Sequence, residues 1–351
     1  MRAYKSAGCI IYSPHPSPLT REEGAFTTAS KGGGYFGRKP KPLTCTHKAG
    51  SITDAQTGVA LITVLLVLAL ATVAVVSMSS ERQLDIRRSE NMLRNNQAWE
   101  YAHSLEQWAM QRLQDQQGFS QPQVSIEENG GVAMHAELDD LQSKLNLNNL
   151  IVEGRDSPND VKRLQRLLKQ LKLPVELTDA ILDWLDADSD IRYPFGAEDE
   201  VYSRKNPPYR TSNRWFSDVS ELMLVQGFSR PMYETLRPYV YAVEGYAPIN
   251  VNTAKPEILR CLADDISKDR AESIYRAAGK PFRKLTEFLQ DEAVNDSGIG
   301  KHGLTVTSQF YQLTGTVEQG RLKLGFLTQL SKQNEGLVTV IRRQRTGWSH
   351  G

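Results

Sequence analysis

The chain has 351 residues, of which 24% are charged, and its formal net charge is +1. The length allows one to three domains, and the near-neutral balance disfavours a protein that binds nucleic acid through net positive charge. Of the three cysteines, only Cys261 follows the long apolar stretch of the chain, so an internal disulfide is excluded from everything after that stretch.

Residues 1–58 form a leader that is rich in Gly, Pro, Ser, Thr and Lys. They hold eight Lys or Arg and three Asp or Glu, a net charge of +5, and they lack apolar periodicity, so we expect disorder. Two explanations stay open: a genuine cytoplasmic tail, and a translation start assigned too far upstream. The basic flank predicts that this side of the next helix stays in the cytoplasm and that the mildly acidic body crosses the membrane.

Residues 59–80 contain no charged side chain and predict the membrane-spanning part of an N-terminal helix. At about 1.5 Å per residue, this length spans the ~30 Å hydrocarbon core of a bilayer. The helical pattern continues without Pro or Gly to Gln117, and Gly118 predicts its end. A cleaved signal peptide would have a shorter apolar core, so we expect one long helix, apolar first and amphipathic after. Its amphipathic part carries one apolar stripe: Leu93, Ala98, Tyr101, Ala102, Leu105, Trp108, Ala109 and Leu113.

The rest of the chain changes from strand patterns to helical patterns and back. Val132–Leu138 and Leu145–Asn148 are typical of strands, and three later segments predict antiparallel strands with short connections: Gln309–Val317, Leu322–Leu330 and Leu337–Arg343. Helical patterns occupy the residues between: Val161–Leu173, Glu176–Leu185, Ser217–Gln226, Pro231–Tyr239, Lys255–Ala263, Lys268–Ala278 and Lys284–Asp291. We therefore expect an α+β fold in which residues 81–152 and 306–345 share one sheet and residues 153–305 form a helical insertion.

The start of the apolar helix and five motifs of the body resemble one protein family. Gly58, followed by Val59 and an apolar run, is similar to the cleavage site and helix of type IV prepilin-like proteins. Most of these proteins have Glu at the fifth mature position, where this chain has Thr63, and this departure resembles the minor pseudopilin K family of type II secretion. The resemblance covers residues 58 to about 345, and its body motifs follow that family's order: Asp183–Asp188, Gly196–Asp199, Pro207–Arg210, Ser220–Leu222 and Pro248–Ala254.

The resemblance implies processing and a fold. A prepilin peptidase would cut after Gly58 and leave Val59 as an N-methylated N-terminus. The long helix would lie on an antiparallel pilin-like sheet, and the insertion would be a large all-α domain of the helix-hairpin-helix or SAM-like kind. A carboxylate deep in a filament is costly unless it is paired, whereas Thr63 can satisfy its hydroxyl on its own helix. A subunit with no neighbour above it needs no such carboxylate.

The resemblance also implies a location, partners and a role. The chain would cross the inner membrane once and place its C-terminal domain in the periplasm. It would join the minor pseudopilins I and J in the tip complex that initiates or caps the pseudopilus for protein export across the outer membrane. Its other partners would be the prepilin peptidase, the inner-membrane assembly platform and the membrane itself. No nucleic acid partner and no catalysis are implied.

An acidic segment follows the predicted helix Glu176–Leu185. The spacing of Asp186, Asp188 and Asp190 is typical of a loop that wraps oxygen ligands around Ca²⁺. It is not an EF-hand, although Glu198 and Asp199 could close another kind of site. The resemblance implies calcium in the helical domain, and a solvated acidic loop remains the alternative. Zinc is disfavoured because no His or Cys lies nearby.

Two hairpins leave a second function open. Val219–Phe228 and Ile249–Ala263 resemble helix-hairpin-helix modules, which would suit a membrane-anchored DNA-binding protein of a competence or type IV pilus system. However, the first turn lacks a second Gly, and Asp264 and Asp265 in the second turn would repel phosphate. We therefore interpret both as structural or protein-contact hairpins. A membrane-anchored hydrolase is a third class, which the scattered histidines do not support: His103, His135, His302 and His350.

Overall fold

The computed structural model describes residues 54–115, 122–128, 131–275, 280–295, 297–333 and 336–347. The chain divides into two compact units, residues 1–73 and residues 74–351, and each is described by itself. The predicted disorder of residues 1–53, the predicted helix end at Gly118 and the turn at Asn129–Gly130 lie outside the described residues.

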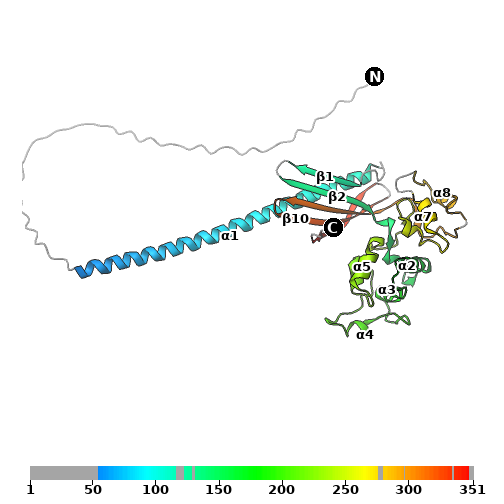
Figure 1. Cartoon of the computed structure of the whole chain (residues 1–351), viewed down its shortest axis with the longest axis horizontal. Coiled ribbons are helices and arrows are strands. Elements are labelled where there is room, and N and C mark those ends of the chain that lie inside the picture. The colour runs from blue at the N-terminus through cyan, green and yellow to red at the C-terminus, as the bar shows by residue number, and fades with distance from the viewer. Residues whose placement is uncertain are drawn as a thin grey trace, which may run out of the picture. The chain divides into compact units, whose positions relative to one another are not determined.

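One helix, α1, runs without a break from Asp54 to Gln114 (Figure 1). Its bounds agree with the predicted long helix, and within the described residues it is the only helix that is long and apolar enough to cross a membrane. Between Val59 and Val76 its large apolar side chains are 55% to 67% exposed among the described residues. Such a surface needs either lipid or another helix around it.

The second unit contains one five-stranded antiparallel sheet in the order β1-β2-β9-β10-β11. Its strands are β1 (Gln123–Glu128), β2 (Val132–Asp140), β9 (Phe310–Gln319), β10 (Leu322–Lys332) and β11 (Val338–Thr346). Because β2 pairs directly with β9, the segments on either side of the insertion complete one sheet, as predicted. The hairpin between β9 and β10 turns at Gly320, whose positive φ of 61° suits glycine.

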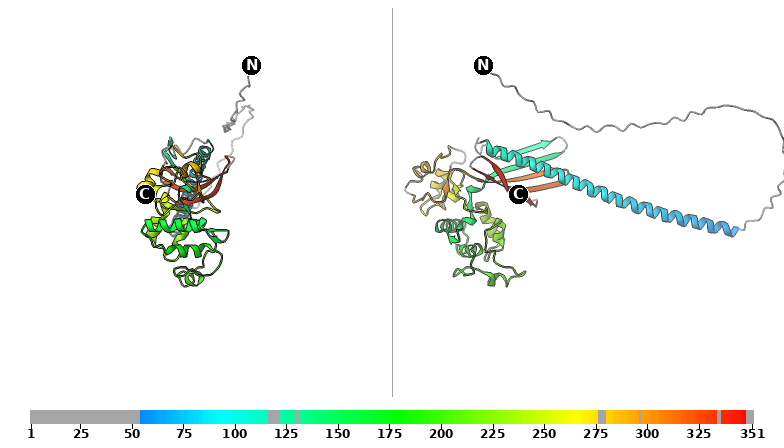
Figure 2. Two further views of the ribbon diagram at one scale, coloured as in Figure 1. Left: turned by 90° about the vertical axis from the view of Figure 1, so that its right-hand side faces the viewer. Right: turned by 180° about the vertical axis from the view of Figure 1, so that it is seen from behind.

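The C-terminal part of α1 covers one face of this sheet (Figure 2). The predicted stripe packs against alternate residues of β9 and β10, and its members from Ala98 to Leu113 are buried or half-buried. Leu93 is an exception, at 59% exposed, because it lies nine residues before Ala102 and therefore on the opposite side of the helix. The buried Glu106 joins the two layers, since its carboxylate accepts hydrogen bonds from the Thr328 hydroxyl at 2.6 Å and from Arg343 Nε at 2.9 Å.

The insertion between β2 and β9 is mainly helical. Its α-helices are α2 (Pro158–Gln170), α3 (Leu177–Leu185), α4 (Asp199–Tyr202), α5 (Arg230–Leu236), α6 (Pro256–Leu259), α7 (Lys268–Ile274) and α8 (Leu285–Leu289). Short 3-10 helices are η1 (Leu141–Ser143), η2 (Leu147–Leu150), η3 (Val219–Met223) and η4 (Arg237–Tyr239). Two-residue strands form the parallel pairs β3 (Leu145–Asn146) with β6 (Val240–Tyr241) and β7 (Ile249–Asn250) with β8 (Leu304–Thr305), and the antiparallel pair β4 (Ile151–Val152) with β5 (Arg155–Asp156).

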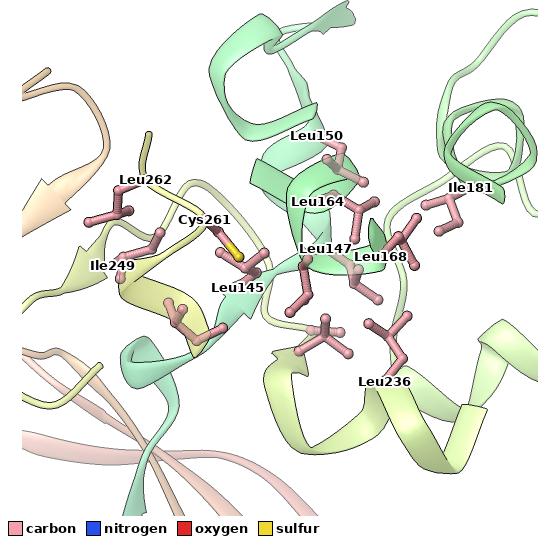
Figure 3. Packing of buried hydrophobic residues seen from close by; sticks show 14 of the residues in the cluster. Leu145, Leu147, Leu150, Leu164, Leu168, Ile181, Leu236, Ile249, Cys261 and Leu262 are labelled. Carbon is pink, nitrogen blue, oxygen red and sulfur yellow. The ribbon is translucent and has the colours of Figure 1, made fainter. Parts of the chain in front are cut away.

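The predicted strand Leu145–Asn148 was wrong beyond its first two residues. In the structure β3 ends at Asn146 and a 3-10 turn follows. Leu145, Leu147 and Leu150 point into the core of the insertion together with leucines of α2 and α5 (Figure 3). The insertion core therefore begins before the predicted boundary at residue 153.

The Asn residues that alternate with Leu in and after the predicted strand Leu145–Asn148 have a structural role. Asn148 accepts a hydrogen bond from Phe216 N at 2.8 Å and donates to the carbonyls of Phe216 and Val243. Asn149 exchanges both kinds of bond with the backbone of Ala247. An amide side chain carries the same donor and acceptor as a peptide group, so these residues replace the strand partners that the segment lacks.

Asp140, the last residue of β2, ties the insertion to the sheet. Its buried carboxylate accepts hydrogen bonds from Gln142 N at 2.8 Å, Ser308 Oγ at 2.6 Å and Asn250 Nδ2 at 3.2 Å, and from the Thr253 hydroxyl. Gln142 lies at the start of the insertion, Asn250 and Thr253 lie in its middle, and Ser308 lies at its end. One side chain thus holds three distant parts of the chain.

We call the sheet, the part of α1 that packs on it and the insertion together the head. We expect Asp140→Asn to lower the free energy of unfolding of the head by about 2–3 kcal/mol. The variant keeps the shape of the side chain but turns an NH₂ group toward hydroxyl donors and removes a charged acceptor. Chemical denaturation of the full chain in detergent would measure the change. Asp265→Asn, at an exposed acid without a described partner, is the control and should stay within about 0.5 kcal/mol. Equal stability of the two variants would contradict the assigned role of Asp140.

Candidate functional site

The apolar helix satisfies its own polar groups. The Thr63 hydroxyl donates to the Ala60 carbonyl at 2.9 Å, as expected from the sequence, and Thr72 and Ser80 donate to their own helix in the same way. The helix begins before Gly58, so the predicted cleavage position lies on helical backbone. A helix with apolar sides and hydroxyls that bond to its own backbone is suited to lipid and to packing against other helices.

The apolar surface of α1 continues beyond its membrane-spanning part. Ile86 and Leu93 are 57% and 59% exposed and lie seven residues apart, which places them on one side of the helix. Leu84 and Met92 are exposed as well. Exposed apolar residues at helical spacing are typical of a contact surface for a partner helix.

The acidic segment folds around Arg192. The guanidinium bridges Asp183 Oδ1 at 2.9 Å, Asp156 Oδ1 at 2.7 Å and Asp186 Oδ2, and Arg192 N donates to Asp183 Oδ2. Asp183 is fully buried at the end of α3, so its charge requires this partner. The alternative of a solvated acidic loop therefore does not describe the whole segment, because part of it is a buried ion cluster.

The structure separates the five predicted calcium ligands into two groups. Asp186 and Glu198 are buried, whereas Asp188, Asp190 and Asp199 are exposed. Asp188 Oδ1 accepts a hydrogen bond from Asp190 N at 2.9 Å, and Asp199 Oδ1 accepts one from Thr211 N at 2.8 Å. Across the described residues, no three His, Cys, Asp or Glu side chains converge as a metal site would require. The five carboxylates do not form one cage.

The two buried acids, Asp186 and Glu198, nevertheless have carboxylate oxygens without hydrogen-bond partners in the described part of the chain. Both carboxylate oxygens of Glu198 and Asp186 Oδ1 make no hydrogen bond among the described residues. Burial, together with the nearby charges of Asp183 and Asp186, raises the pKa of Glu198 from 4.5 to about 7, although the Thr211 hydroxyl and the Asp199 backbone N–H lie near enough to lower it in part. A buried carboxylate in this state requires either a proton or a cation.

Neutral oxygens lie on the neighbouring segment Thr211–Asn213. The hydroxyls of Thr211 and Ser212 and the side-chain oxygen of Asn213 are also buried without a described partner. This segment is tied to the acidic loop on both sides, through Thr211 N to Asp199 and through Asn213 Nδ2 to the Asp188 carbonyl at 3.2 Å. Carboxylate, hydroxyl and amide oxygens are the donors that calcium prefers, so this set fits the ion. The sequence prediction missed Thr211–Asn213 as candidate ligands. The only feature of the sequence that could have indicated them is the run of three small polar residues after a proline-rich turn.

The two predicted hairpins pack inside the insertion. Gly227 turns the first with a positive φ of 87°, and the methyl Cδ2 of Leu177 closes the space beside its Cα. In the second, Asp264 binds Arg166 of α2 through both carboxylate oxygens, at 2.6 and 2.8 Å. The acidic turn thus serves a contact within the protein, as the structural interpretation predicted.

Comparison with known proteins gives one consistent result. Family models described as "Type II secretion system (T2SS), protein K" match residues 143–245 and 249–307. The type II secretion system protein K of Pseudomonas aeruginosa is 33% identical over 309 residues, which cover 82% of this chain and 92% of that protein. The protein K of Aeromonas hydrophila is 35% identical over 326 residues, which cover 83% of this chain and 98% of that protein.

A solved structure shows the same fold. The chain is similar to a chain in the crystal structure of the GspK-GspI-GspJ complex from the type 2 secretion system of enterotoxigenic Escherichia coli, with a TM-score of 0.66. The two are 21% identical, and the match covers 74% of this chain and all of that one.

Proposed function

This chain belongs to the family of type II secretion system protein K, and we propose that it is the minor pseudopilin that joins minor pseudopilins I and J at the tip of the pseudopilus. There it initiates or caps the filament that exports proteins across the outer membrane. The observation that carries the proposal is α1, whose apolar sides are uncovered over its whole first part and whose Thr63 has no need of a neighbouring amine.

The membrane helix supports an assembly role with one anchor. The single apolar span fits a protein that crosses the inner membrane once, with its head in the periplasm. Before assembly the span would lie in lipid, and in the filament it would pack against the helices of other subunits. The prepilin peptidase and the inner-membrane assembly platform would be partners of this same segment. Catalysis has no part in the proposal.

The matched structure is a complex of GspK, GspI and GspJ, which supports minor pseudopilins I and J as partners of this chain. The exposed side of α1 at Ile86 and Leu93 offers these partners an apolar surface on the part of the helix that leaves the membrane. The second hairpin turn is acidic and its Asp264 is engaged with Arg166, which disfavours the alternative of a DNA-binding protein at this turn.

We also propose that a prepilin peptidase cuts after Gly58. The glycine stands directly before the uncharged span, and cleavage there would leave all of residues 59–80 in the mature chain. Methylation of the new N-terminus at Val59 would accompany the cut.

We further propose that the insertion binds calcium. Asp186 and Glu198 would supply the carboxylate oxygens, and the Thr211–Asn213 segment would supply neutral ones. When bound, the ion would supply the positive charge that Arg192 gives to Asp183 and Asp186 but not to Glu198. The residues would hold the long loop between α3 and η3 in one conformation.

A charge on the exposed side of α1 should weaken the tip complex. We expect Ile86→Glu combined with Leu93→Glu to reduce co-purification with minor pseudopilins I and J at least about tenfold, because each new carboxylate would be buried without a partner. Asn91→Glu, which adds the same carboxylate on the opposite side of the helix, is the matched control. Unchanged recovery of I and J with the double variant would contradict the proposed contact.

Intact mass and N-terminal sequencing of the chain from its own cells would test processing. The mature chain should begin at Val59, and Gly58→Val should leave it uncut because the larger side chain occupies the position that the peptidase reads. Gly50→Val, a matched change within the leader, should leave processing intact. Any other mature N-terminus would refute the assignment.

Calcium and pH should both change the stability of the protein through the carboxylate of Glu198. Since the pKa of Glu198 is about 7 in the folded protein and 4.5 ordinarily, the folded state holds a proton between these values that the unfolded state has lost. Without calcium, the melting temperature of the full chain in detergent should therefore fall as pH rises from 4.5 to 7. At pH 7.5, calcium at about 100 times its Kd should restore about 2.7 kcal/mol.

Glu198→Gln should reduce the pH slope between 4.5 and 7 and remove the calcium effect, and Asp186→Asn should reduce the calcium effect. The control Glu200→Gln changes a neighbouring exposed acid and should keep both. Differential scanning fluorimetry with chelator or calcium would measure all four proteins. A calcium response of Glu198→Gln equal to that of the unaltered chain would show that the ligands are wrong.

A further inference from the structure

A cleft of about 630 Å³ lies between the sheet and the insertion, on the face of the sheet that α1 leaves open. We call it the sheet cleft. Its floor is formed by Gln312 and Thr314 of β9, Leu327 and Gln329 of β10, and Gln344 and Thr346 of β11. Its wall is formed mainly by α5 and η4, with Tyr233 among the side chains that line it. The volume is in the range of ligand sites, about 300–1,000 Å³.

The floor is an ordered row of amide and hydroxyl groups. Gln312 pairs in register with Gln329, and Leu327 pairs with both Thr314 and Gln344. The residues before and after each of them on β10, such as Phe326 and Thr328, face α1 and are buried. The period of two in each strand therefore places Phe326 and Thr328 on the face that α1 covers and Gln312, Gln329 and Gln344 on the face that forms the cleft floor.

Several of these groups have no partner in the protein. Among the described residues, the side chains of Gln329, Gln344 and Thr346 and the phenol of Tyr233 make no hydrogen bond to another protein group. Gln329 is only 9% exposed. Half-buried donors and acceptors that face a cleft of this size are available to a ligand that brings donors and acceptors of its own.

The wall is held over the floor by one ion pair. Arg342 of β11 lies beside Gln329 in the sheet and contacts Asp218 of the insertion at 3.2 Å. Its guanidinium also donates to the Ser217 carbonyl. The cleft is thus formed within the folded head and does not depend on a ligand to bring its sides together.

The lining excludes most classes of ligand. It carries three cationic and three anionic side chains, which disfavours nucleic acid and other anions: Lys144, Arg230, Arg237, Asp139, Asp218 and Glu234. Its floor has a single apolar side chain, Leu327, and four apolar residues of the wall are almost fully buried and offer little surface, which disfavours lipid: Leu141, Val240, Tyr241 and Ala242. An extended peptide would pair with a free strand edge, and the free edge near the cleft is the outer edge of β11, which lies beside the floor. A ligand on the floor itself meets side chains, because the backbones there already pair with one another.

We propose that the sheet cleft binds a neutral oligosaccharide. Sugar hydroxyl and N-acetyl groups both donate and accept hydrogen bonds, as do the amides of Gln329 and Gln344 and the hydroxyl of Thr346. Tyr233 supplies an aromatic body with a polar end, which suits the mixed faces of a sugar ring. The source is either a cell-wall glycan or a free oligosaccharide, since both present the same chemistry.

Saturation-transfer NMR on the full chain in a detergent without a sugar headgroup tests the site, with the β-1,4-linked tetramer of N-acetylglucosamine as the probe. We expect saturable transfer to the tetramer, and a Kd weakened at least about tenfold in Gln344→Leu combined with Thr346→Val, because two or more hydrogen bonds are lost. Gln226→Leu, the same change at an exposed residue of the insertion outside the cleft, should bind as the unaltered chain does.

Melting temperatures of all variants are measured alongside, and Tyr233→Leu serves as a second variant should the double variant be destabilised. Pelleting of the chain with purified sacculi would assign the ligand to the cell wall, and binding of the tetramer alone would assign it to a free oligosaccharide. The proposal is overturned if the unaltered chain shows no transfer, if stably folded cleft variants bind equally well, or if a neutral Gly-Ser-Thr peptide binds in the cleft and the tetramer does not.

Discussion

The head depends on one buried carboxylate at the point where the chain leaves its sheet. A charge removed from water is tolerated only when hydrogen bonds replace its hydration, and Asp140 receives four. The Ser308 hydroxyl that donates to it is 168 residues further along the chain, directly before β9. Because all donors must be in place together, β2 and β9 are held as neighbours and the insertion leaves and returns at one place.

Inside the insertion, neutral amide side chains likewise provide the hydrogen bonds that buried polar groups need. Its helices are short and its paired strands have two residues each, so few backbone groups meet a regular partner. Asn146, Asn149 and Asn252 supply the missing donors and acceptors, and Asn252 bonds to the backbone of both Phe282 and Val306. The leucines between them fill the core. Amide side chains thus give a loop-rich domain the order that longer helices would otherwise give.

The three proposed roles, which are assembly, calcium binding and oligosaccharide binding, lie on parts of the protein that differ in charge and polarity. Along the membrane span the hydroxyls of Thr63, Thr72 and Ser80 bond to their own helix, which leaves a mainly apolar surface for lipid or partners. In the acidic segment Arg192 compensates Asp183 and Asp186, but Glu198 remains buried without a counterion. The sheet cleft is neutral and polar. Association, ion binding and ligand binding therefore draw on separate surfaces and can be altered separately by mutation.

The sequence by itself determined the long helix, its uncharged span, the stripe from Ala98 to Leu113 and four of the five strands of the sheet, because these features depend on periodicity within a single segment. The edge strand β1 (Gln123–Glu128) was not predicted. It also identified Gly58, Thr63 and the acidic loop as the residues to examine. It could not show that Leu145–Asn148 belongs to the insertion, because alternation of Leu and Asn has the same period as a strand. Nor could it divide the five carboxylates or add Thr211–Asn213 to them. Those assignments depend on which distant segments meet, and only the tertiary structure places Arg192 between Asp156, Asp183 and Asp186 and leaves Glu198 without a partner.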